Sequence, residues 1–210
     1  YIATYVINIP GLNSGTVLLL LYLVVGSGMF GGILLTPVIY KKLGYKTTCV
    51  IAAVTGGVSL TAAFLLGKIN IYFALPFMTI GGLSLGSYNV LPYPMVGDSL
   101  DYLEWKTGER MEGVCFSLNS FVTKFNNAVG FIGLSAALTL FHFIEPSAAG
   151  VPAVQSASTV TGLFSLVTVI PGSGFFLSLI PICFYDFSGV KKEKILSELV
   201  VKRKAIKNGV

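Results

Sequence analysis

Five long apolar stretches follow one another along the chain, and short polar segments separate them. Each stretch is long enough to cross a bilayer as a helix, which takes about 20 residues. None alternates apolar and polar residues with the period of two that characterises barrel strands. The pattern therefore predicts an all-α polytopic membrane protein. Within residues 16–186 we expect transmembrane helices at about residues 16–40, 48–67, 71–96, 114–143 and 161–185.

The segments that flank these stretches have a different character. Residues 1–15 read as the last turns of an earlier helix followed by an outer loop, so we expect the chain to be part of a longer protein. Residues 187–210 form a basic tail, in which Ile195, Leu199 and Ile206 lie near one side of a helix. Basic amphipathic helices bind membrane surfaces. We therefore expect the tail to lie on the inner leaflet.

Composition supports a membrane protein, and the placement of charge predicts its orientation. Hydrophobic residues make up 54% of the chain and charged residues only 11%, against about 25% charged residues in soluble domains. If the loops alternate sides, every basic residue except Lys68 and Lys124 falls on one side, which is cytoplasmic by the positive-inside rule. Loops 41–47 and 97–113 and the C-terminus are then cytoplasmic, in a multi-pass protein of the cell (inner) membrane. The net charge of +5 needs no nucleic-acid partner.

Two of the predicted helices carry pairs of glycines four residues apart. The pairs are Gly28 with Gly32 and Gly82 with Gly86. Small residues at this spacing let two helix backbones approach closely in a membrane. We interpret them as positions of tight helix packing rather than as part of a ligand site.

The fourth predicted helix has a polar face. At helical spacing the face comprises Ser117, Asn119, Ser120, Thr123, Lys124, Asn126 and Asn127. Lys124 lies about 15 Å past the start of the helix, at 1.5 Å per residue. A lysine so deep costs about 2.5–3.5 kcal/mol and usually faces a cavity or a partner. All nine carboxylates lie in loops, span ends or the tail, so the partner is an anionic or polyhydroxylated ligand, or an acid outside this chain.

The most specific motif precedes this helix and enters it. The segment MVGDSLDYLEWKTGERMEGVCFSLNSFVTK closely resembles the signature D-x-x-D-Y-x-E-x-K-T-G-x-R-x-E-G-x-x-F-S of the glycoside–pentoside–hexuronide:cation symporter family. This family belongs to the major facilitator superfamily, and melibiose permease is its best-known member. The segment PVIYKKLGYK, residues 37–46, is similar to the family's basic loop between helices eight and nine.

The resemblance implies that the chain is the C-terminal six-helix half of a major facilitator fold, comprising the end of helix seven and helices eight to twelve. In this family two six-helix halves rock around a sugar site between them, which gives alternating access. The implied function is secondary active transport, in which a sugar or glycoside enters with Na+ or H+. The acids that bind the coupling cation belong to the missing N-terminal half, so we expect neither a metal site nor a cofactor in this half.

The resemblance also implies roles for individual residues. On helix eleven, Lys124, Asn119 and Ser120 match polar positions that line the sugar cavity. On helix ten, Tyr88 or Asn89 occupies the region where melibiose permease presents a tryptophan to the sugar. The expected substrate-binding residues are therefore Lys124, Asn119, Ser120, Asn127, Tyr88 and Asn89.

The charges of the same motif lie where two rocking halves meet at the cytoplasmic mouth. We expect Asp98, Asp101 and Arg110, with Glu104 beside them, to form a gate by pairing with opposite charges on the N-terminal half. Partly exposed ion pairs contribute about 0.2–1 kcal/mol each. Several together supply the roughly 1.4 kcal/mol that shifts a two-state balance tenfold.

Two alternatives stay open, one from a rival family of transporters and one from a different functional class. Vertebrate lysophospholipid symporters share this fold and have a lysine in a similar place. A non-transporting membrane protein would use the polar face for helix association. An enzyme is not expected, because the sequence has no nucleophile–base pair, metal cluster or glycine-rich phosphate loop. Cys49, Cys115 and Cys183 lack metal-ligand spacing, and we interpret them as buried free thiols.

Overall fold

The described residues of this chain form helices and short connections, with no strand among them. The computed structural model describes residues 2–6, 12–145, 153–187 and 189–207. The elements in chain order are the short turn η1 (Ile2–Val6) and the helices α1 (Ser14–Leu43), α2 (Tyr45–Gly67), α3 (Ile71–Val90), α4 (Pro92–Thr107), α5 (Glu112–Leu140), α6 (Ala157–Val167), α7 (Val169–Phe184) and α8 (Gly189–Lys207).

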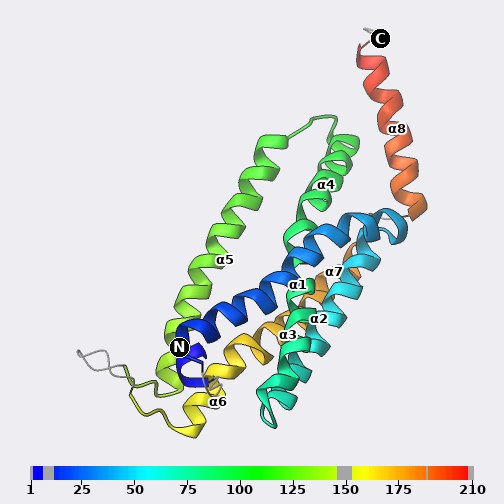
Figure 1. Cartoon of the computed structure of the whole chain (residues 1–210). Coiled ribbons are helices and arrows are strands. Elements are labelled where there is room, and N and C mark those ends of the chain that lie inside the picture. The colour runs from blue at the N-terminus through cyan, green and yellow to red at the C-terminus, as the bar shows by residue number, and fades with distance from the viewer. Residues whose placement is uncertain (1, 7–11, 146–152, 188, 208–210) are drawn as a thin grey trace.

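The long helices form a bundle with α5 beside it. Helix α1 packs along α3, α3 along α2, and α2 along α7 (Figure 1). Helix α5 contacts α4 and α6, and it stands beside the bundle rather than within it. Helix α8 packs against α4 beyond the end of α7. The three cysteines are free thiols, of which Cys49 is buried as expected, whereas Cys115 is half-buried and Cys183 is exposed.

Four of the described helical segments are long and apolar enough to cross a membrane. They are Ser14–Leu43, Tyr45–Gly67, Ile71–Thr107 and Ala157–Phe184. Helix α5 is 29 residues long but is not one of these four, because its polar face lowers its hydropathy. Four of the five expected spans are thus present as apolar helices, and the fifth stays a prediction.

Prolines divide two of these segments into pairs of helices. Helices α3 and α4 meet at Leu91, where Pro92 and Pro94 have no N–H for the carbonyls one turn earlier. Helices α6 and α7 meet at Thr168, because Pro171 likewise cannot bond to the carbonyl four residues before it. The Thr168 hydroxyl donates to the Phe164 carbonyl at 2.6 Å, which satisfies one acceptor at this break.

The expected cytoplasmic loop at 97–113 is mostly helical. Helix α4 continues to Thr107, and only residues 108–111 connect it to α5. The turn begins at Gly108, whose φ of 80° is left-handed and favours glycine. Charge density suggested a loop, but the acids Asp98, Asp101 and Glu104 recur every three residues and share one face of α4. That face is covered by basic residues, so the helix persists.

The glycine pairs lie where α1 and α3 cross. An added Cβ at Gly28 would lie 2.0 Å from the Thr79 carbonyl oxygen, and one at Gly86 would lie 2.0 Å from the Met29 carbonyl oxygen. A hydroxyl pair strengthens the crossing, since Thr36 Oγ1 donates to Ser87 Oγ at 2.8 Å. Close backbone approach through small residues, predicted from the spacing, is confirmed.

Candidate functional site

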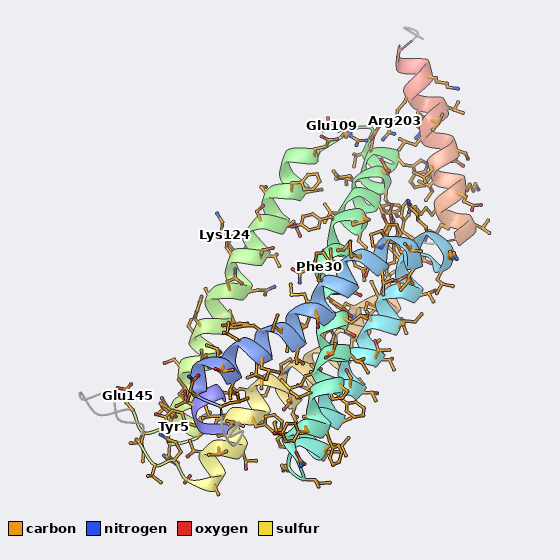
Figure 2. The ribbon with its side chains drawn as sticks, in the orientation of Figure 1. Tyr5, Phe30, Glu109, Lys124, Glu145 and Arg203 are labelled. Atoms are coloured by element: carbon orange, nitrogen blue, oxygen red, sulfur yellow. The ribbon has the colours of Figure 1, made fainter. Side chains whose placement is uncertain are left out.

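The polar face of α5 is exposed over most of its length. No described residue of α5 is buried, and Lys124, Ser120 and Asn127 are exposed while Asn119 is half-buried. Lys124 projects away from α4 in Figure 2. Its ammonium forms no ion pair with any residue that the structure describes. The helix therefore presents a cation and several amides and hydroxyls with no internal partner for the charge.

The two candidate residues on α3 have different surroundings. The Tyr88 hydroxyl lies 2.6 Å from Ser178 Oγ of α7, and the Tyr88 ring packs edge-on against Phe175. Asn89 is exposed, and its Nδ2 donates to the Leu85 carbonyl at 3.0 Å. Tyr88 is thus held against α7, whereas α5 contacts mainly α4 and α6. The structure does not bring these two residues together with Lys124.

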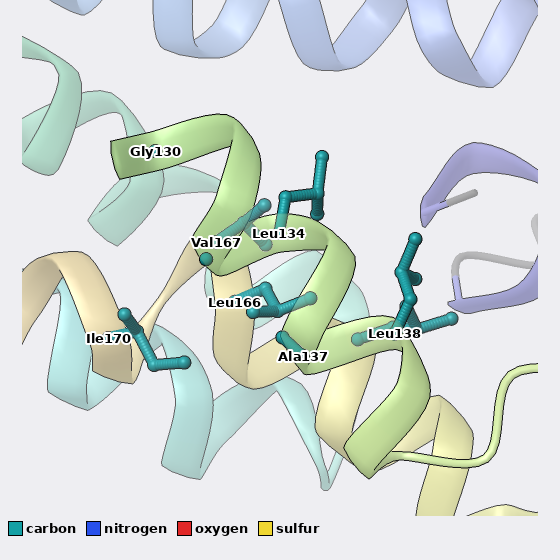
Figure 3. Close-up of a pocket in the computed structure, with 9 residues that line it drawn as sticks. Gly130, Leu134, Ala137, Leu138, Leu166, Val167 and Ile170 are labelled. Carbon is teal, nitrogen blue, oxygen red and sulfur yellow. The ribbon is translucent and has the colours of Figure 1, made fainter. Parts of the chain in front are cut away.

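A pocket of about 390 Å³ lies between α5 and α6, below the polar face (Figure 3). Its lining comprises Gly130, Gly133, Leu134, Ala137, Leu138, Leu163, Leu166, Val167 and Ile170. All nine are apolar, so no side chain there can donate a hydrogen bond to a sugar hydroxyl. This pocket is therefore not the candidate substrate site.

The first gate residue, Asp98, is buried and paired within the chain. Lys192 Nζ of α8 donates to both Asp98 oxygens at 2.6 Å, and the Tyr185 hydroxyl donates to Oδ2 at 3.2 Å. Burial and the neighbouring Asp98 carboxylate raise the pKa of Tyr185 well above its usual range, so its hydroxyl stays protonated as a donor. Side chains from α8 and from the segment after α7 thus both donate to the Asp98 carboxylate of α4.

The other gate residues form a second cluster further along α4. Arg203 Nη2 of α8 lies 2.9 Å from Asp101 Oδ1 and 2.6 Å from Glu104 Oε2, and Figure 2 shows it reaching toward the end of α4. Arg110 Nη1 lies 3.0 Å from the same Glu104 oxygen and 3.4 Å from Asp101, while its Nε contacts Glu112 at 2.5 Å. The hydrogen bonds to Glu104 and Asp101 raise the pKa of the Arg203 guanidinium. Two arginines therefore share two carboxylates.

The tail helix is attached to α4 rather than free to lie on lipid. Ile195 and Leu199 are only 5% and 2% exposed, and α4 is the main contact of α8. Trp105 Nε1 donates to Glu198 Oε2 at 2.7 Å across the same interface. The expectation that this apolar side rests on the inner leaflet is thus wrong for Ile195 and Leu199. The Ile206 side chain is outside the described part of the chain.

The sequence led us to expect the partners of the gate acids on the N-terminal half, but two of these partners are Lys192 and Arg203 of α8. Glu198 of the same helix accepts a hydrogen bond from Trp105. One signal was present: Lys192, Ile195, Leu199 and Arg203 recur at intervals of three and four residues, so they share one face of a helix. A face that combines apolar and basic residues fits an acidic helix as well as a membrane surface.

Removing the partner of Asp98 should destabilise the chain measurably. We expect Lys192→Leu to cost about 1–3 kcal/mol, since a buried polar group then loses its charged donor. Thermal unfolding of the purified protein in detergent measures this change. The control is Lys191→Leu, whose pair with Asp186 has side chains 50% and 79% exposed and should contribute little. Equal losses in the two variants would contradict a special role for the Asp98 pair.

The amino-acid sequence is similar to those of known sugar transport proteins. The family model for MFS/sugar transport proteins matches residues 1–189. The chain is 27% identical over 200 residues to the glucuronide carrier protein homolog of Escherichia coli (strain K12), covering 95% of this chain and 42% of that relative. It is 30% identical over 174 residues to the isoprimeverose transporter of Lactiplantibacillus pentosus, covering 81% of this chain and 34% of that relative.

The chain is also 28% identical over 194 residues to the uncharacterized symporter YjmB of Bacillus subtilis (strain 168), covering 89% of this chain and 40% of that relative. The chain spans about two fifths of the length of the first of these curated relatives. No solved structure matches it.

Proposed function

Because this chain belongs to the MFS/sugar transport protein family, we propose that it is the C-terminal half of a secondary transporter. The carrier imports a sugar or glycoside together with Na+ or H+ by alternating access across the cell membrane. The coupling cation binds in the N-terminal half, and α5 contributes the substrate-binding face of this half. Three relatives, a glucuronide carrier homolog, an isoprimeverose transporter and a symporter, support this proposal.

The observation that carries the proposal is Lys124 on an exposed helical face. An uncompensated ammonium in lipid is costly, so intramembrane lysines face water-filled cavities or partners. The amides of Asn119 and Asn127 and the hydroxyl of Ser120 share this face, and such groups bind sugar hydroxyls through directional hydrogen bonds. This face lines a water-filled cavity between the two halves. Water in the cavity solvates the Lys124 ammonium, and a substrate in the cavity can contact it.

The charge of Lys124 favours a sugar that carries an acidic group. Lysine is a point charge that pairs with a carboxylate, as glucuronides possess, through charge-assisted hydrogen bonds. A neutral disaccharide such as isoprimeverose would receive only ordinary hydrogen bonds from it. We therefore assign the substrate to the acidic glycosides and use the neutral one as the comparison.

The charged cluster at the end of α4 serves as the cytoplasmic gate. Asp101 and Glu104 are held by two arginines, of which Arg110 precedes α5 and Arg203 belongs to α8. When the two halves meet, charges of the N-terminal half replace one of these arginines. When the halves separate at the cytoplasmic side, Asp101 and Glu104 pair again with the arginines of this chain. Neither carboxylate is therefore unpaired in the inward-open state.

Uptake measurements test the function directly. The product of the complete gene, expressed in cells, should accumulate a labelled glucuronide when a sodium or proton gradient is applied, and less isoprimeverose. Cells with an empty vector provide the background, and a lithium gradient tests cation selectivity. A lysophospholipid is included because such symporters share the fold. Uptake of the lysolipid alone, or of no solute while the protein reaches the membrane, would overturn the proposal.

A further inference from the structure

A second pocket lies at the opposite side of the chain from the polar face of α5, where four helix ends meet. Its volume is about 290 Å³. It is formed by the end of α1, the start of α2, the segment after α7 and the start of α8, and Figure 1 shows these helix ends close together. The lining residues are Tyr40, Lys41, Gly44, Tyr45, Lys46, Tyr185, Phe187, Gly189 and Lys192. Three of the nine are lysines, and none is acidic.

The charge of this pocket is only partly compensated. Lys192 is paired with Asp98. Among the described residues, Lys46 Nζ donates hydrogen bonds to neutral acceptors, the carbonyls of Cys183 at 3.1 Å and Tyr185 at 3.0 Å, and the carboxylate of Asp186 interacts with its charge without forming an ion pair. Lys41 is exposed and forms no ion pair with any residue that the structure describes. The charge of Lys41 therefore remains for a ligand, and that of Lys46 is only partly offset by Asp186. An anion is the complementary occupant.

The backbone and the aromatic side chains favour the same kind of ligand. Gly44, the N-cap residue of α2, provides no side-chain cap, so the N–H groups of the first turn of α2 are available to an anion. The rings of Tyr40 and Tyr45 lie 4.5 Å apart, and Lys192 lies 4.7 Å from the centre of the Tyr45 ring. Phe187 closes the side next to α8. Aromatic rings of this kind mark the boundary between lipid and water.

The position of the pocket along the helices points to lipid rather than to a soluble anion. The apolar segments end at Leu43 and Phe184 and begin at Tyr45, so the pocket lies where the membrane-spanning parts stop. Leu43 and Phe184 are 51% and 82% exposed beside it, which provides an apolar surface for acyl chains. Lipid phosphates occupy this level of the bilayer, and basic pockets between helices bind anionic head groups.

We propose that this pocket binds the phosphate of an anionic phospholipid such as phosphatidylglycerol. Lys41 and Lys46 contact the phosphate, the α2 N-terminus receives one of its oxygens, and the packed pair of Tyr40 and Tyr45 contacts the glycerol from one side. The acyl chains run over Leu43 and Phe184. The site is independent of the sugar pathway and would be occupied whether or not the carrier transports.

Titration with short-chain lipids tests the proposal on the purified protein. Native mass spectrometry should show dioctanoyl phosphatidylglycerol binding that dioctanoyl phosphatidylcholine does not match. Lys41→Gln and Lys46→Gln should each weaken phosphatidylglycerol binding about fivefold, the factor that about 1 kcal/mol per basic residue represents. Lys41→Arg should retain binding. Lys42→Gln is the matched control, since Lys42 is adjacent and exposed but does not line the pocket.

Three outcomes would overturn the proposal. They are equal binding of the two lipids, equal loss in Lys42→Gln and Lys41→Gln, and binding of free glycerol phosphate as tight as that of the lipid. The last result would identify a soluble phosphate as the ligand. Lys41→Gln decides the test even if Lys46→Gln fails to fold, because no described contact depends on the Lys41 side chain.

Discussion

Lys124→Leu should reach the membrane in normal amounts and lose gradient-driven accumulation of an acidic glycoside. The substitution leaves the number of residues in α5 unchanged and raises the hydropathy of the helix, so membrane insertion is not impaired. Removing one member of a charged, hydrogen-bonded pair costs about 2–5 kcal/mol, which is at least about thirtyfold in affinity. Uptake of labelled glucuronide, normalised to the amount of protein in the membrane, measures the loss.

Two companion experiments separate a role in binding from a role in structure. Lys124→Arg keeps the positive charge and should retain part of the uptake, whereas Lys124→Leu should not. If the lysine acts on the acidic group, the loss in Lys124→Leu should be larger for the glucuronide than for isoprimeverose. If Lys124→Leu takes up the glucuronide at the wild-type rate, Lys124 does not bind the substrate and the proposed cavity is contradicted.

Adding one methyl group at the crossing of α1 and α3 should prevent correct packing. A Cβ at Gly32 would lie 2.0 Å from the carbonyl oxygen of Leu83, and the obstructing atom is backbone, which no rotamer change can move. Overpacking costs about 1–3 kcal/mol and sometimes more, and here the helices must separate to relieve it. We expect Gly32→Ala to lower the yield of folded protein sharply, as measured by size-exclusion chromatography and thermal unfolding in detergent.

The neighbouring glycine provides a matched control with the opposite expected sign. Gly31 precedes Gly32 in the same helix, and an added Cβ there would meet nothing within 4 Å. Alanine is favoured over glycine in helices by about 1 kcal/mol, so Gly31→Ala should be neutral or slightly stabilising. If both variants unfold alike, the crossing does not depend on close approach at Gly32.

Much of the fold was predictable because it rests on local properties of the chain. A helix in a membrane is specified by about 20 consecutive apolar residues, so the segments now found as α1, α2, α3 and the α6–α7 pair could be located from hydropathy alone. The family was also predictable, since the motif around Asp98 and Arg110 has specific spacing, and the match to MFS/sugar transport proteins confirms it. The assignment to the C-terminal half stays a prediction.

The candidate site was predictable only where a single helix carries it. The stripe that includes Lys124 and Asn127 follows from helical spacing, and the structure shows it exposed on one helix. Which residues of other helices join it depends on how the helices pack. Tyr88 illustrates this limit, because its contact with Ser178 of α7 joins residues 90 apart in the chain. Its role in substrate binding stays a prediction.

By itself, the sequence determined the helical class, four apolar spans, the close glycine crossing and the polar face, all of which depend on residues within a few turns of one another. Only the tertiary structure decided the partners of the α4 acids and the surface that covers the tail. Asp98 and Lys192 are 94 residues apart in the chain, and no periodicity links them. An apolar and basic face on α8 fits either anionic lipid or an acidic helix, and packing against α4 wins because it buries Ile195 and Leu199 and pairs three carboxylates at once.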